Sequence, residues 1–389
     1  MKQSQRRGWL VLLGLLLAAP ATAQKAKDVC GDRPHCIVKG TQRAPKGHEV
    51  VELSLGKESG KEEEEDSKCE QKEWWLRRPD KSVVKLLDSC PETQGIGEDE
   101  VNVEKNRFIH TVTGGARERW ERVAELQLVP LVWARGEQVS YDALDTEKMN
   151  RASFDYATFE GRSTWASCET VKAQLVPAVA VPAHFLSEGW KRMSLGRCSV
   201  DGSFVLRGKA QGEEDARIRA VLAQGNVLLL EVMDDTWTGP GEKWLTDDHV
   251  ELWLSGWGPT SFNTCDDEEE QTGLLQWGIR IADGKVFSAY GEPKEPLPVE
   301  VAREGKVAHL KIQLPWEPGG LTVIYSDSDE GKKQELMVGT SALKFGRAAT
   351  LSQVWRITPA QATCEVKENQ LVPVRTELHP KPGETAIGE

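Results

Sequence analysis

Short runs in which apolar and polar residues alternate constrain this chain more than any other feature of its sequence. In residues 250–254, Val, Leu and Leu occupy every second position and are separated by Glu and Trp. Such alternation places the apolar side chains on one face of a β-strand. Similar runs, bounded by turn residues, recur at 217–222, 227–232, 273–281, 307–314, 321–325 and 354–357. Helical periodicity is scarce, so we predict an all-β protein with two β-rich domains, the C-terminal one an antiparallel β-sandwich.

The first 23 residues have the features of an export signal. Lys2, Arg6 and Arg7 precede an apolar run at 9–19, and the sequence Ala21-Thr22-Ala23 suits cleavage by a signal peptidase. The run is too short to span a bilayer, and no later segment is apolar for long enough. We therefore expect a cleaved signal peptide, no membrane span and a secreted or periplasmic protein.

Eight cysteines follow this segment: Cys30, Cys36, Cys69, Cys90, Cys168, Cys198, Cys265 and Cys364. An even number behind an export signal, with no Cys-x-x-Cys pair, predicts disulfide bonds rather than a zinc site.

One disulfide can be argued from a predicted hairpin. Cys69 and Cys90 lie at equal distances from Pro79-Asp80, a turn sequence flanked on both sides by apolar runs. Antiparallel pairing around that turn would bring the two sulfurs opposite each other. Order along the chain suggests Cys168–Cys198 and Cys265–Cys364, although many other pairings are open.

A change of composition near residues 198–202 predicts a domain boundary. The expected organisation is a signal peptide (1–23), a β-rich disulfide-containing domain of unknown type (24–199), a β-sandwich (200–364) and a disordered tail (365–389). The tail is polar and punctuated by proline, with little to bury. Residues 171–185 also contain proline, and we expect irregular edge or linker structure there.

The net charge of −12 limits the classes of partner. An acidic protein is a poor candidate for nucleic acid or for an anionic membrane surface, and suits cations, neutral ligands or basic partners. The charge run 61–66 (KEEEED) is expected to be a solvated loop.

Residues 201–357 resemble carbohydrate-binding module family 9, a DOMON-like (jelly-roll) β-sandwich. The similarity lies in the order of several segments: DGSF at 201–204, RIRAV at 217–221, NVLLLEVMDD at 226–235, WLTDDHVELWL at 244–254, LPW at 314–316 and SDSDEG at 326–331. It covers roughly 40% of the chain and none of residues 24–200. It implies a non-catalytic sugar-binding sandwich, often with structural calcium and no organic cofactor.

In sugar-binding members of that family two tryptophans grip the ligand. Trp244 matches the first of them, in the loop before the Asp-x-Val-Glu strand, with one extra residue before Val-Glu. The second would lie near residues 339–341, where this sequence has no tryptophan. Trp316 is our candidate substitute, and Trp355 is an alternative to it.

The residues around Trp244 suit a sugar on physical grounds as well. The C–H face of a pyranose ring stacks on a flat indole, while carboxylates and amides bind the hydroxyl groups. Asp247 and Asp248 follow Trp244 closely and are the predicted hydroxyl-binding carboxylates. The alternative is that Trp244 only closes the end of the sandwich.

Trp253 is a separate case because it alternates away from the predicted core residues of its strand. It should share the opposite face with His249 and Glu251. That face would be a binding surface or a contact with the first domain.

Acidic loops are candidates for calcium. Asp234 and Asp235 end one predicted strand, and Asp327 and Asp329 alternate with serine after another. Oxygen ligands of this kind are those that hard cations need, although no EF-hand spacing is present. Solvated loop carboxylates are the alternative, and the acidic stretch 266–270 is a weaker candidate of the same kind.

No catalytic motif is present in the sequence: it has no His-Glu-x-x-His, no Gly-x-Ser-x-Gly and no phosphate-binding loop. We therefore predict an exported non-catalytic protein that binds a polysaccharide or oligosaccharide through its C-terminal sandwich. The alternative is a structural or interaction module that binds proteins of the cell envelope through the same sandwich without binding sugar.

Overall fold

The structure is a computed structural model that describes residues 29–33, 35–56, 71–90, 96–165, 171–210, 212, 215–256, 274–291, 296–343 and 350–387. The predicted signal peptide, Cys69, Cys168, Cys265 and the acidic stretches 61–66 and 266–270 lie outside these residues. The fold is almost entirely β, as predicted. No helix of the described part is long and apolar enough to cross a membrane.

The chain forms two compact units. The first comprises residues up to Asp99, Val103–Arg107 and Leu378–Glu389, and the second comprises Glu100–Asn102 and Phe108–Glu377. This division differs from the boundary predicted near residues 198–202. The change of composition there coincides with shorter strands and is not a domain boundary, because the residues on both sides of it belong to the second unit.

The first unit contains a four-stranded antiparallel sheet in the order β1-β2-β3-β4. Its strands are β1 (Cys36–Arg43), β2 (Glu49–Leu55), β3 (Gln71–Arg77) and β4 (Val83–Ser89), with the short helix η1 (Pro45–Gly47) between the first two. The predicted hairpin is confirmed: β3 pairs with β4, with Arg77 opposite Val83 beside the turn. Asp80 stabilises this turn by accepting hydrogen bonds from the backbone and hydroxyl of Ser82.

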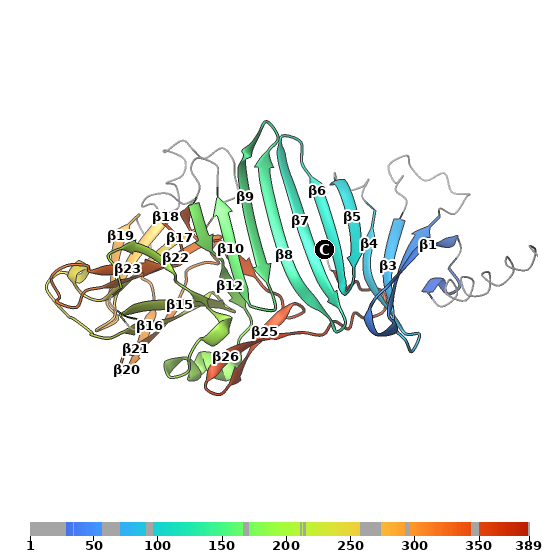
Figure 1. The fold of residues 1–389 in the computed structure, drawn as a ribbon. Coiled ribbons are helices and arrows are strands. Elements are labelled where there is room, and N and C mark those ends of the chain that lie inside the picture. The colour runs from blue at the N-terminus through green and yellow to red at the C-terminus, as the bar shows by residue number, and fades with distance from the viewer. Residues whose placement is uncertain are drawn as a thin grey trace, which may run out of the picture. The chain divides into compact units, whose positions relative to one another are not determined.

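The second unit begins with a sheet of long antiparallel strands that follow one another in the sequence (Figure 1). They are β6 (Arg107–Gly114), β7 (Glu118–Leu128), β8 (Leu131–Asp142), β9 (Asp145–Asp155), β10 (Glu160–Trp165) and β11 (Val171–Gln174); the residues of β5 (Ile96–Glu104) are divided between the two units. From β6 to β10 each strand reaches the next through a short turn, and the order of the whole sheet follows the sequence.

The rest of the second unit contains a β-sandwich. One sheet has the order β20-β21-β16-β15-β12-β24, with β13 also beside β15, and the other has the order β14-β23-β22-β17-β18-β19. The strands are β12 (Val176–Val179), β13 (Val200–Asp201), β14 (Phe204–Arg207), β15 (Ala216–Ala223), β16 (Val227–Asp234), β17 (His249–Ser255), β18 (Leu274–Arg280), β19 (Val286–Tyr290), β20 (Val299–Glu304), β21 (Val307–Gln313), β22 (Gly320–Asp327), β23 (Leu336–Gly339) and β24 (Val354–Arg356).

The sandwich core consists of the alternating apolar residues predicted from the sequence. Val250, Leu252 and Leu254 of β17 are fully buried in it, together with Ile218 of β15 and Leu310 of β21. Each strand supplies every second residue, so burial of these rows drives the two sheets together.

A second core covers the outer face of the sheet that contains β15 and β16. Its helical part consists of α2 (Ala183–Ser187), η3 (Gly189–Lys191) and η4 (Gly196–Cys198), and its hairpin consists of β25 (Ala362–Lys367) and β26 (Gln370–Arg375). Phe185, Trp190 and Leu371 are buried there against Val221 and Leu229.

Two expectations about these segments are wrong. Residues 365–387 of the predicted disordered tail are ordered, because β26 pairs with β25 along its length and Leu371 is buried. Residues 171–185 are not a linker: β12 lies between β15 and β24 and pairs with both in parallel. Proline was the misleading signal, since Pro177 occupies β12 despite lacking a backbone donor.

Two disulfides join described cysteines: Cys30–Cys36 and Cys198–Cys364. The second overturns the pairs Cys168–Cys198 and Cys265–Cys364, which sequence order alone had suggested. Its cause is the packing of β25 against the segment before β13, which brings residues 166 positions apart into contact. Cys90 is also disulfide-bonded; the predicted Cys69–Cys90 pair stays a prediction, since Cys69 lies outside the described residues.

Replacing both Cys198 and Cys364 by alanine should destabilise the second unit by about 2–5 kcal/mol, because this disulfide closes a long loop and constrains the unfolded chain. Denaturant unfolding followed by tryptophan fluorescence would measure the loss. The matched control is the alanine double variant of Cys30 and Cys36, which closes a loop of only 6 positions and should cost less. An equal or smaller loss for the Cys198/Cys364 variant would contradict the expectation.

Candidate functional site

Trp244 lies in the connection between β16 and β17, within the short helix η5 (Trp244–Thr246). Its indole rests over Gly278 of β18: a Cβ added to Gly278 would come within 2.2 Å of the indole ring. Glycine therefore leaves the space that the ring fills. Trp244 is half-buried and not fully enclosed.

Two other aromatic rings fix the orientation of Trp244. Phe287 of β19 stacks nearly parallel to it, with ring centroids 5.3 Å apart and an interplanar angle of 11°. His249 meets it edge-on at 4.9 Å. Phe287 is the direct cross-strand partner of Gly278, so the strand register itself places Phe287 beside the indole.

Trp244 and Phe287 line a surface depression of about 420 Å³. The other residues that line it are Gly241, Glu242, Lys243, Leu245, Arg280 and Lys285. The side chains of Arg280 and Lys285 lie 5.6 Å and 5.3 Å from the centre of the Phe287 ring. The depression thus combines flat aromatic surface with charged hydrogen-bonding groups.

Asp247 supports this depression from inside the protein. Its carboxylate accepts hydrogen bonds from the Gly241 N–H, at 2.9 and 3.0 Å, and pairs with Arg280 at 3.2 Å. Only 1% of Asp247 is exposed. The prediction that Asp247 binds sugar hydroxyl groups is therefore wrong, because its carboxylate faces the interior. It holds the loop and orients Arg280 instead.

Asp248 also faces inwards. It accepts hydrogen bonds from the backbone N–H groups of Thr238 and Ser328 and is fully buried. These bonds tie the loop before β17 to the loop after β22. The structure thus assigns Asp248 to an acidic cluster and not to the surface of the depression.

That cluster, here called the inner triad, consists of Asp234, Asp248 and Asp327. The three residues come from the end of β16, the residue before β17 and the end of β22, and all are buried. One carboxylate oxygen of each lies within 4.8 Å of the others. Tyr325 donates its hydroxyl hydrogen to Asp234 from within the core.

Burial and mutual repulsion change the ionisation of the inner triad. Burial, followed by the charge of Asp234, raises the pKa of Asp327 to about 8. Burial likewise raises the pKa of Asp234 to about 7, although the hydrogen bond from Tyr325 opposes this. The pKa of Asp248 is also raised by burial.

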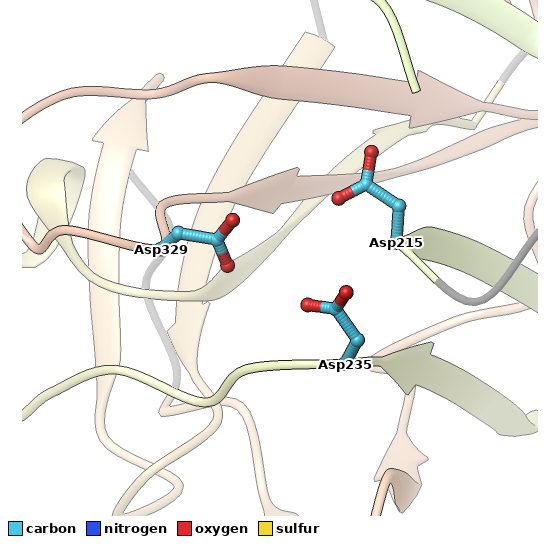
Figure 2. Close-up of side chains that lie close together, drawn as sticks. All are labelled: Asp215, Asp235 and Asp329. Atoms are coloured by element: carbon cyan, nitrogen blue, oxygen red, sulfur yellow. The ribbon is translucent and has the colours of Figure 1, made fainter. Parts of the chain in front are cut away.

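A second acidic group, here called the outer triad, consists of Asp215, Asp235 and Asp329 (Figure 2). Figure 2 shows the three carboxylates pointing toward one another, and their oxygens also lie within 4.8 Å. Burial and the charge of Asp235 raise the pKa of Asp329. Asp215 was not predicted from the sequence, where it is distinguished only by its place just before the start of β15.

The two triads suit a hard divalent cation. Carboxylate oxygens that lie this close can share an ion of the size of calcium, which takes ligands at about 2.3–2.6 Å. Asp327 Oδ1 and Asp329 Oδ1 are buried and accept a hydrogen bond from no described residue. Buried oxygens in this condition are costly unless a proton or a cation satisfies them. The four predicted metal ligands, Asp234, Asp235, Asp327 and Asp329, thus divide between the two triads.

The structure does not bring Trp316 to Trp244. Trp316 lies between β21 and β22, where its indole nitrogen would be 3.8 Å from a Cβ on Gly256. Gly256 follows the last residue of β17, whereas Trp244 contacts His249, the first. A two-tryptophan clamp from this pair is therefore wrong. Trp355, the alternative, is buried in the second core and stacks on Phe154.

Trp253 does lie on the face of β17 opposite the sandwich core, as predicted, but it is only 2% exposed. It packs among Leu274, Ile324, Met337, Leu343 and Leu351. All of these belong to the second unit. Residues of the sandwich itself cover this face, so Trp253 is not part of a ligand surface.

No protein-family model and no curated protein matches the sequence. Among solved structures, similar chains include a carbohydrate binding module family 9 from Caldicellulosiruptor kristjanssonii in complex with cellotriose, which is 10% identical and covers 51% of this chain and 97% of the module, with a TM-score of 0.35. The same module family from that organism in complex with glucose is 12% identical and covers 46% of this chain and 95% of the module, with a TM-score of 0.31.

Both structures belong to the family that residues 201–357 resemble. TM-scores this low are too weak to carry an argument about the ligand of this chain. The function proposed below therefore rests on the residues themselves.

The inner triad predicts that, in the absence of divalent cations, the stability of the folded protein falls as the pH rises. The folded protein retains protons on Asp327 and Asp234 up to pKa values of about 8 and 7, whereas the unfolded chain releases them near the ordinary value of 3.8. Stability from these groups is thus complete below about pH 4 and is lost as pH rises to about 8. A pKa difference of one corresponds to about 1.4 kcal/mol, and we expect a larger loss than that.

Thermal unfolding in EDTA between pH 5 and 8 would measure this loss. Asp327→Asn cannot ionise, so its unfolding temperature should vary less with pH than that of the wild type. A variant whose pH profile is parallel to the wild-type profile would contradict the assignment.

Proposed function

We propose that this chain is an exported, non-catalytic protein whose β-sandwich binds carbohydrate at the depression beside Trp244. The observation that carries the proposal is the parallel pair of Trp244 and Phe287 in a depression lined by charged side chains. Export is supported by the signal-like N-terminal sequence and by the disulfides, which persist in oxidising compartments.

The depression offers both halves of sugar recognition. A pyranose ring presents an apolar C–H face, which packs against aromatic surface, and a rim of hydroxyl groups, which need donors and acceptors. Trp244 and Phe287 supply the aromatic surface, Lys243 and Lys285 supply donors, and Glu242 supplies acceptors. Arg280 is held in place by Asp247 and Asp283. Trp244, Phe287 and Arg280 are thus set in position before a ligand arrives, which lowers the entropic cost of binding.

Calcium is the proposed structural cofactor of the same region. Asp234, Asp248 and Asp327 would hold one ion, and Asp215, Asp235 and Asp329 would hold a second. A bound ion would offset the repulsion among the carboxylates and so secure the ends of β16 and β22 to the start of β17. Since Asp248 adjoins Asp247, the ion would also stabilise the loop that carries Trp244.

The alternative function is a structural or protein-binding module without sugar affinity. The surface around Trp253, which was its candidate binding face, is not accessible to a partner. The exposed apolar residue beside the depression is Leu245, with 49% of its surface accessible. This residue favours contact with an extended, partly apolar ligand over contact with a small isolated sugar. A polysaccharide meets that description as well as a protein does.

Trp244→Ala should weaken binding to soluble oligosaccharides and insoluble polysaccharides at least tenfold, or about 1.4 kcal/mol, because it removes the stacking surface. Trp244→Phe should retain part of the affinity. Glycan-array screening followed by isothermal titration calorimetry would measure both. The matched control is Trp316→Ala, which lies at the other end of β17 and should bind normally. The proposal fails if no glycan binds, or if binding is the same with and without Trp244.

Calcium should raise the unfolding temperature of the second unit. At 100 times its dissociation constant the ion would add about 2.7 kcal/mol of stability. Differential scanning calorimetry in EDTA and in CaCl2 would measure the shift. Asp234→Asn and Asp327→Asn should reduce it, whereas Asp283→Asn, a nearby carboxylate paired with Arg280, should not. An unfolding temperature that does not respond to calcium would refute the cation site.

A further inference from the structure

The long sheet of the second unit carries a second depression, of about 170 Å³, here called the sheet pocket. The register of the strands places many of its lining residues on one face. Trp120 of β7 lies opposite Ser140 of β8, and Gln138 lies opposite Ala152 of β9, which in turn lies opposite Ser163 of β10. Directly opposed residues point to the same side of a sheet, so these side chains form adjoining rows.

Residues from the connection before β24 complete the pocket. Thr350, Leu351 and Gln353 line it, and the last of these is half-buried. The pocket therefore lies between the long sheet and a segment of the sandwich, and both belong to the second unit.

Several polar side chains of the sheet pocket are not used by the fold. Four on its face or in the connection before β24 form a hydrogen bond with no described residue: Gln138, Ser140, Ser163 and Gln353. Three of the four are half-buried. Together they offer two amides and two hydroxyls, each able to donate and to accept. Partly buried groups of this kind require a partner from solvent or from a ligand.

Trp120 gives the pocket a fixed aromatic wall. Its ring packs over Gly114, where an added Cβ would come within 2.4 Å, so the absence of a side chain at Gly114 sets its position. Arg122 lies over the ring at 5.3 Å and further restricts it. Val171 and Ala173 add apolar surface beside the hydroxyl groups.

Arg122 is the charged side chain on this face among the described residues that line the pocket. Glu121 and Arg151 belong to a row with Val139 and Thr164 that faces the other side of the sheet, where Arg151 pairs with Glu137 at 2.9 Å. The volume is below the ~300–1,000 Å³ that is usual for drug-sized ligands, so the ligand should be small.

We propose that the sheet pocket is a second binding site, which takes one hexose residue. An aromatic wall, four unused hydrogen-bonding side chains, the Arg122 guanidinium and the small volume together match the C–H face and hydroxyl rim of such a ligand. The site is independent of the depression beside Trp244, because the two share no residue.

Titration of the full mature chain with D-glucose, D-galactose and D-mannose, followed by NMR of the tryptophan indole N–H groups, would test the proposal. The Trp120 signal is assigned by its loss in Trp120→Phe. We expect that signal to shift with at least one sugar, with an affinity of roughly millimolar strength. The double variant Gln138→Leu/Ser140→Ala keeps Trp120 and should weaken the response at least tenfold.

Trp244→Ala separates the two sites. A Trp120 shift that persists in Trp244→Ala and is weakened by Gln138→Leu/Ser140→Ala supports the sheet pocket, even if the site beside Trp244 binds nothing. A Trp120 signal that does not shift at about 50 mM of any of the three sugars, roughly fifty times a millimolar dissociation constant, overturns the proposal. So does a shift that disappears in Trp244→Ala alone.

Discussion

The repulsion between buried carboxylates at one end of the sandwich is the interaction on which the rest of the site depends. Asp234 and Asp327 end two strands and Asp248 precedes a third, and one carboxylate oxygen of each lies within 4.8 Å of the others. None of the three forms an ion pair with a described side chain. Only protons or a bound cation can make such an arrangement stable. The loop that carries Trp244 is attached to this cluster through Asp248. The stability of the aromatic depression therefore depends on whether the three carboxylates are protonated or bind a cation.

Much of the sandwich could be predicted from the sequence because each strand has its own periodic signal. Val250, Leu252 and Leu254 alternate, and burial in the core follows directly from that pattern. The acidic residues at the strand ends were found for the same reason, since strand ends are visible in the sequence. Asp215 was missed and Asp248 was given the wrong role, because the distance between strand ends of two sheets depends on topology, which no local pattern records.

The errors share a physical cause, which is contact between residues far apart in the sequence. The segment around Pro177 and the tail after Glu365 look unable to support a fold by themselves. Each is nevertheless ordered by a remote partner: β12 by β15 and β24, and β25 by the disulfide from Cys198 to Cys364. Trp120 gave no functional signal in the sequence, because its neighbours in the sheet pocket come from four strands and a loop.

The position of β12 has a consequence for how the chain must fold as it is synthesised. Its two neighbours are β15, which follows about 40 residues later, and β24, which begins at Val354. The edge that β24 covers therefore stays open until nearly the whole chain has emerged. An unpaired strand edge that persists for so long invites association between nascent chains. A chaperone that covers this edge until β24 has formed would therefore limit such association.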